Sequence, residues 1–155
     1  MSGHHGGYPP LVQDDLPVGD PHRRPAGASD ATVQAVGKLS EALEWVERAR
    51  GAVYELHQLL GRADLTFGEA VEALRAAGHD DEADLVAAEV VGRNVLPGRW
   101  TFAVVEEFED TYWEPVREVE RRVRHHLVQG RRHIFESELK ESRRTSGHPA
   151  HESRP

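Results

Sequence analysis

The sequence predicts an all-α protein, an antiparallel bundle of two long helices with two short helices between them and a C-terminal helix. Apolar residues recur at three- and four-residue steps through residues 30–143. The same region shows no period-two alternation and no hairpin turn of the Asn-Gly type. Glycine and proline gather outside it, so we expect a disordered N-terminal tail (1–29), a helical domain (30–143) and a disordered C-terminal tail (144–155).

The first long helix is expected over residues 31–60, with Asp30 as its N-cap and Gly61 at its end. Arg50 and His57 occupy two positions of its main apolar seam, and the other positions are Val36, Leu39, Leu43, Val46, Val53 and Leu60. A second apolar stripe consists of Trp45, Ala49, Ala52, Leu56 and Leu59. Because the stripe widens the apolar face, we expect this helix to lie inside a bundle.

Two short helices follow before residue 100. Thr66 and Glu69 form a capping box that opens the first, and Gly78 ends it. Acidic residues at 80–84 suit the positive end of the second helix, which stops before Pro97.

The second long helix is expected over residues 101–129. Pro115 lies inside its apolar stripe and removes a backbone hydrogen bond, so we expect a kink near Thr111. A last helix, over 131–143, has only three apolar anchors, Ile134, Phe135 and Leu139. With so few anchors, it is the element that we expect to lean on a partner.

Composition limits the compartment and the chemistry. The chain is 38% hydrophobic and 30% charged, which suits one globular domain. It has no cysteine, so disulfides and thiolate metal sites are excluded. We find no membrane span and no signal peptide, and expect a cytoplasmic protein.

Charge is distributed unevenly along the chain. Residues 31–116 carry a net charge of −10, and residues 117–144 carry +4. The basic end is open to three interpretations: docking on the chain itself, head-to-tail pairing with a second copy, or nucleic-acid binding through 117–133. Glu118 and Glu120 lie four residues before Arg122 and Arg124, and such internal pairs disfavour nucleic acid.

Three acids, Glu106, Asp110 and Glu114, follow one another at four-residue spacing. Like charges at this spacing repel on one helical face, so this acidic row requires a compensating partner. Arg50 and His57 are expected to face the same interior. We interpret the group as a structural ion-pair network; a functional polar cavity that includes Glu109 is the alternative.

Carboxylates one turn apart also permit a metal site. The spacing of Glu106, Glu109 and Asp110 is similar to the way in which all-α nucleotide pyrophosphohydrolases of the MazG type present acids to magnesium. Phe108 divides this group with an apolar residue, and the helices have no Glu-x-x-His motif for a di-iron site. We therefore expect no cofactor, and a Mg- or Mn-dependent hydrolase of a phosphorylated small molecule is the alternative.

The corner formed by residues 92–102 concentrates unusual residue types, including Arg93, Asn94, Arg99 and Trp100. Tryptophan and arginine are frequent hot-spot residues at interfaces. The corner is either a recognition surface or a tight turn in which Trp100 covers the bundle end and an arginine pairs with the acidic row.

The segment from Gly37 to Arg144, with its Gly92-Arg93-Asn94-Val95, Gly98–Phe102 and Glu106–Asp110 stretches, resembles an uncharacterised family of small all-helical actinobacterial proteins. The resemblance implies an actinobacterial, cytoplasmic origin and no known activity. The function that we expect is a non-enzymatic module for self-association or protein binding, acting through the 92–102 corner and the last helix.

Overall fold

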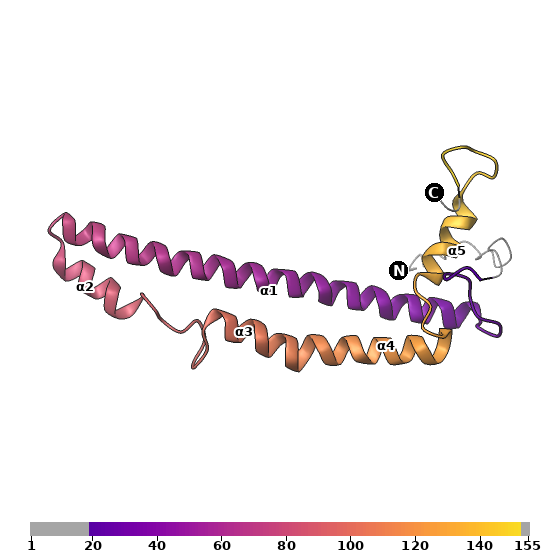
Figure 1. Cartoon of the computed structure of the whole chain (residues 1–155), viewed down its shortest axis with the longest axis horizontal. Coiled ribbons are helices and arrows are strands. Elements are labelled where there is room, and N and C mark those ends of the chain that lie inside the picture. Colours follow the sequence, from indigo (N-terminus) through magenta and orange to yellow (C-terminus); the bar gives the residue numbers. More distant parts are fainter. Residues whose placement is uncertain (1–18, 153–155) are drawn as a thin grey trace, which may run out of the picture. The chain divides into compact units, whose positions relative to one another are not determined.

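The computed structural model describes residues 19–152, and this part of the chain is helical without a β-strand (Figure 1). The predicted all-α fold is confirmed. The elements are α1 (Asp30–Ala76), α2 (Asp80–Glu89), α3 (Thr101–Phe108), the π-helical turn η1 (Glu109–Trp113), α4 (Glu114–Val128) and α5 (Ile134–Arg143). Within 19–152, no helix combines the length and the apolar character that a membrane crossing requires.

The chain divides into two compact units, each described by itself below. Unit 1 comprises Met1–Leu43 and Arg117–Pro155, and unit 2 comprises Glu44–Val116. The single predicted domain 30–143 therefore contains parts of both units. Residues 1–18 and 153–155 of the predicted tails lie outside the described residues.

Helix α1 is one continuous element of 47 residues, about 13 turns. The expected break between Gly61 and Thr66 is therefore wrong. Glycine inside a helix costs only about 1 kcal/mol relative to alanine, so a single glycine does not by itself end a helix. The Thr66 hydroxyl donates to the carbonyl of Arg62 at 2.9 Å, which is the bond of a helix interior and not of an N-cap.

The end of α1 follows the sequence prediction. Gly78 has a φ of +83°, a conformation that glycine adopts readily. The amide of His79 donates to the carbonyl of Leu74 at 2.9 Å, and the amide of Gly78 donates to that of Arg75 at 3.0 Å. This pair of bonds is a Schellman motif, and α2 then begins at Asp80 with His79 as its N-cap.

The helical run that starts at Thr101 is interrupted by η1, where the irregularity near Thr111 was expected. Pro115 has no amide hydrogen to donate to the carbonyl of Thr111. The amide of Glu114 donates to the carbonyl of Glu109, five residues back, as in a π-helix. A π-helical turn therefore accommodates Pro115 without ending the helical run.

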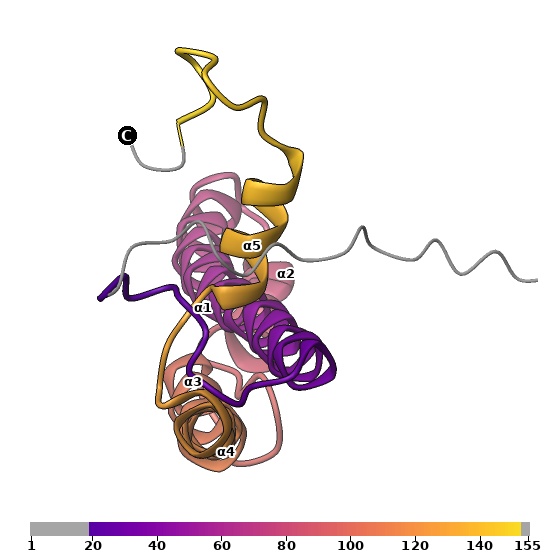
Figure 2. The same ribbon diagram turned by 90° about the vertical axis from the view of Figure 1, so that its right-hand side faces the viewer.

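Unit 1 closes a small apolar core around the start of α1. The buried side chains are Val33, Val36, Val128 and Ile134, with Phe135 packed against them. Figures 1 and 2 agree that α4 and α5 approach this part of α1 from different sides. Helix α5 is thus docked within its own chain, and its predicted contact with a partner stays a prediction.

Candidate functional site

A polar cluster in unit 2 joins α1 to η1. The Nε and Nη2 atoms of Arg50 bond Oε1 of Glu109 at 2.7 and 2.6 Å, and the Tyr54 hydroxyl donates to the same oxygen at 2.9 Å. The guanidinium also lies 4.2 Å from the ring centroid of Trp113, a cation–π distance. The bonds from Arg50 and Tyr54 hold the pKa of Glu109 below its ordinary value, because they favour the ionised carboxylate.

His57 makes a separate contact, 2.7 Å from its Nδ1 to the hydroxyl of Thr101 at the start of α3. Both predicted seam residues of α1 therefore find polar partners on the helical run that begins at Thr101. Arg50 bonds the carboxylate of Glu109, and His57 bonds the hydroxyl of Thr101.

The acidic row does not face an interior. Glu106, Asp110 and Glu114 are all exposed, so the expectation that they meet Arg50 and His57 in a shared interior is wrong. The row crosses η1, where residues five apart bond to each other, and four-residue spacing no longer selects one face. Glu109 takes the place next to Arg50 that was predicted for the row.

The same contact bears on the predicted metal set of Glu106, Glu109 and Asp110. The Glu109 carboxylate is already bonded by Arg50 and Tyr54. Nowhere in 19–152 do three or more histidine or acidic side chains form a group able to hold a metal ion. The geometry of the described residues gives the Mg or Mn alternative no support.

The 92–102 corner is a tight turn with a fixed scaffold. Leu96 and Arg99 exchange backbone hydrogen bonds across Pro97 and Gly98, and Gly98 has the positive φ, +71°, that a type II turn requires. Arg99 bonds both oxygens of the Glu107 carboxylate, with 2.8 Å between Nη2 and Oε1. Arg99 thus pairs outside the acidic row.

Other predicted corner residues point to solvent. Arg93 pairs with Glu89 at 3.6 Å, and Asn94 is exposed. Trp100 is 56% exposed and Phe102 51% exposed, with ring centroids 6.3 Å apart. Trp100 therefore does not act as a buried cover for the bundle end.

Unit 2 as a whole leaves most of its large apolar side chains uncovered. Its buried apolar residues are Val71, Ala83 and Val105. Thirteen large apolar side chains of Glu44–Val116 are exposed, and they are Trp45, Tyr54, Leu56, Leu59, Leu65, Phe67, Leu85, Val91, Val95, Leu96, Trp100, Phe102 and Tyr112. In unit 1, only Val119 and Leu127 are exposed in this way among the described residues.

The second stripe of α1 belongs to this uncovered set. Trp45 is 60%, Leu56 44% and Leu59 62% exposed, and Ala49 and Ala52 between them are exposed as well. The prediction that the stripe widens a buried face is wrong within the described chain, because unit 2 supplies helices on the other seam of α1 only.

Unit 1 contains buried ion pairs that the sequence did not reveal. Arg24 bonds both carboxylate oxygens of Glu138 at 2.6 Å and also bonds Asp30 at 2.7 Å. Arg24 lies before Asp30, in the segment expected to be an N-terminal tail, and its side chain is buried. The sequence of α5 contains one signal for these pairs. Glu138 and Glu141 share a helical face with Ile134, and acidic side chains that are buried with an apolar residue require cationic partners.

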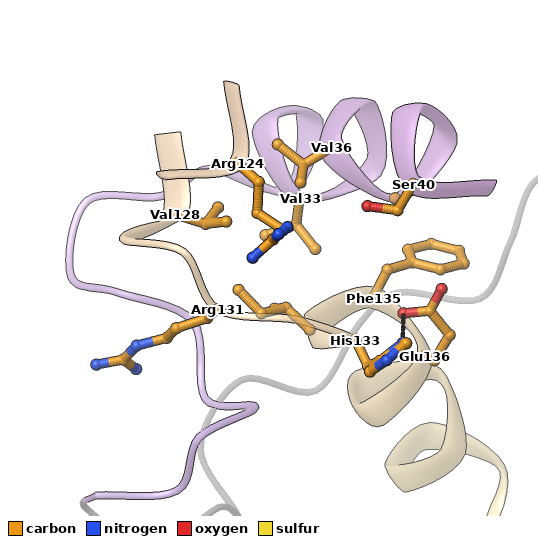
Figure 3. Close-up of a pocket in the computed structure, with 11 residues that line it drawn as sticks. Val33, Val36, Ser40, Arg124, Val128, Arg131, His133, Phe135 and Glu136 are labelled. Carbon is orange, nitrogen blue, oxygen red and sulfur yellow. Dashed lines mark ion pairs between the residues drawn. The ribbon is translucent and has the colours of Figure 1, made fainter. Parts of the chain in front are cut away.

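Figure 3 shows a cavity of about 20 Å³ in unit 1, between the start of α1, the end of α4 and α5. Val33, Val36, Val128 and Ile134 form its apolar wall, and Nδ1 of His133 lies 4.0 Å from the Glu136 carboxylate beside it. A space of this size holds about one water molecule. It is too small for an organic substrate.

The basic stretch 117–133 is partly neutralised by neighbouring acids. Arg124 pairs with Glu120 at 2.9 Å, as predicted, whereas Glu118 pairs with Arg121 at 2.7 Å and not with Arg122. These pairs reduce the charge that this helix offers to a phosphate backbone.

Comparison with protein-family models, with curated proteins and with solved structures finds no match for this chain. The resemblance to an actinobacterial family stays a prediction.

Proposed function

We propose that the protein is a non-enzymatic helical module that self-associates or binds a protein partner through the uncovered apolar surface of unit 2. The observation that carries this proposal is that thirteen of the 25 large apolar side chains in Glu44–Val116 are exposed, whereas only Val71 and Val105 among them are buried. Large apolar patches on soluble proteins mark interaction sites. No cofactor is part of the proposal.

Energetics favour covering this surface. Burying one large apolar side chain contributes about 1.5–3 kcal/mol, so a few of these residues supply useful affinity. Trp100 and Phe102 are of the aromatic type enriched at interface cores. The proposal retains the 92–102 corner of the sequence prediction and replaces the last helix by the outer face of α1.

The corner is also prepared for binding. The Arg99–Glu107 pair fixes one side of it, and the amide of Gly92 donates to the Asp64 carboxylate at 2.7 Å on the other. A loop that is already ordered loses less conformational entropy when a partner docks.

The test compares the wild-type protein with a unit 2 variant in which Leu56, Leu59, Trp100 and Phe102 are changed to serine. The control changes Val119 and Leu127 of unit 1 to serine, since they are exposed in the same way. Sedimentation velocity measures self-association, and capture on immobilised protein with quantitative mass spectrometry measures saturable partner binding.

We expect the wild type and the control to associate and the unit 2 variant to lose association while its helical circular dichroism persists. A wild-type chain that is monomeric at every concentration and retains no protein saturably would overturn the proposal.

A further inference from the structure

The uncovered stripe of α1 has the spacing of a coiled-coil seam. We define the outer stripe as Trp45, Ala49, Ala52, Leu56, Leu59 and Ala63, which follow one another at steps of four, three, four, three and four residues. These are alternating d and a positions of a heptad. All but the half-buried Ala63 are exposed, so the seam lacks a partner helix within unit 2.

A column of charged residues borders this stripe. Arg48, Glu55, Arg62 and Glu69 follow at seven-residue steps, which places them at the g positions of the same heptads. Their charges alternate in sign, and all four are exposed. Within the described chain, no ion pair engages Glu55, Arg62 or Glu69.

The other border of the stripe is apolar. Its e positions hold Val46, Val53 and Leu60, which are half-buried on the inner side of α1. In a parallel coiled coil, g residues face e residues of the partner helix. A parallel pairing would therefore set the charged column against apolar side chains that are already packed.

An antiparallel pairing of two copies matches the charged column with itself. When two such helices run in opposite directions, the two g columns lie beside each other. With the apolar stripes paired about a centre between residues 57 and 58, the g columns, which are offset from the stripes, set Glu55 beside Arg62 of the partner subunit and Arg48 beside Glu69 of the partner subunit. By symmetry this gives four opposite-charge contacts, while a shift of seven residues in one helix gives like-charge contacts.

The apolar residues fit the same register. Leu56 lies opposite Leu59 of the partner subunit, and Ala52 lies opposite Ala63 of the partner subunit. Small alanines on both sides of the central leucines allow the helix axes to approach closely. The bulky Trp45 meets Ala70 of the partner subunit, so a large side chain faces a small one.

We infer that the outer stripe is the dimer interface, covered by α1 of a second copy in the antiparallel register that pairs Glu55 with Arg62 of the partner subunit. The inference rests on the proposed function and names its partner. Self-complementary charge on an unpartnered heptad stripe is the observation that selects a second copy over an unrelated protein.

The chain has no cysteine, so disulfide trapping reports the register directly. Ala52→Cys and Ala63→Cys proteins are mixed in full-length form and oxidised mildly. The expected result is a disulfide between the two variants and none when either is oxidised alone. A disulfide of Ala52→Cys with itself would indicate a parallel dimer and overturn the inference, as would the absence of any disulfide.

Charge reversal provides a second test. Glu55→Arg turns two attractive contacts into repulsive ones and should weaken dimerisation about tenfold. Arg62→Glu should do the same, and the double variant E55R/R62E should restore the wild-type dissociation constant. Neither residue has a charged neighbour three or four positions away, so the monomeric helix is unaffected.

The outcomes separate this inference from the proposed function. A dimer abolished by L56S/L59S and kept by W100S/F102S supports it. If the single variants Glu55→Arg and Arg62→Glu weaken the dimer and the double variant E55R/R62E does not restore its dissociation constant, the proposed register is overturned. A monomer that still captures a protein through unit 2 overturns the inference alone, whereas a monomer that captures nothing overturns the proposed function as well.

Discussion

Replacing Arg24 by alanine should destabilise unit 1 by about 3–5 kcal/mol, because the change leaves a buried carboxylate without its counter-charge. The Glu138 side chain is only 2% exposed, and Arg24 bonds both of its oxygens at 2.6 Å. The loss is a large share of the roughly 5–15 kcal/mol that stabilises a typical domain.

The assay has to report on unit 1 specifically. All three tryptophans, Trp45, Trp100 and Trp113, lie in unit 2, so their fluorescence does not follow α5. Amide hydrogen exchange along Ile134–Arg143 reports directly on α5. Destabilisation of this size should accelerate exchange of the protected α5 amides roughly 100-fold or more.

Two matched variants make the result interpretable. Arg121→Ala breaks the exposed pair with Glu118 and should cost at most about 1 kcal/mol. Arg24→Met combined with Glu138→Leu removes both buried charges and should recover most of the loss. If Arg24→Ala proved no more harmful than Arg121→Ala, the reasoning from burial would be refuted.

Two further predictions concern packing and pH. Gly51→Ala should raise the free energy of unfolding, measured in a thermal melt, by about 1 kcal/mol, because nothing lies within 4 Å of the new Cβ. Gly37→Ala should raise it by less, since the new Cβ would lie 3.1 Å from Cβ of Phe135. Equal stabilisation by the two variants would contradict this steric argument. The pKa of Glu109 is lowered in the fold by Arg50, so its stabilisation is present above about pH 4.5 and is lost as pH falls through the folded pKa. Unfolding followed by tryptophan fluorescence should therefore depend less steeply on acid pH in Glu109→Gln than in the wild type, and identical slopes would count against the Arg50 contact.

Much of the fold follows from local sequence patterns. The stop at Gly78 and the start at Thr101 were predicted, because capping and glycine preferences act within a few residues. The continuity of α1 through Gly61 was not. Whether a helix tolerates an interior glycine depends on the packing of its flanking turns, which a residue's own propensity does not contain.

The sequence predicted that Arg50 has a carboxylate partner, but it did not predict which carboxylate. Arg50 on an apolar seam requires a carboxylate from the facing helix, and one is present. Which of Glu106, Glu109 and Asp110 faces Arg50 depends on how the helical run from Thr101 is rotated against α1, and that rotation is set by packing that a local sequence pattern does not contain. Arg24 gave no periodic pattern at all, because it acts from an irregular segment.

The two units differ in how completely they cover α1, and this difference favours an interface over a solvated face at the outer stripe. Unit 1 surrounds the first turns of α1 with α4, α5 and the segment before Asp30, and it buries even charged groups in pairs. Unit 2 packs against α1 on the seam of Arg50 and His57 and leaves the stripe of Leu56 and Leu59 open. A face selected only for contact with water would have no reason to keep heptad spacing in its apolar residues or alternating signs in its bordering charges. Both regularities are required when a second helix lies along that face.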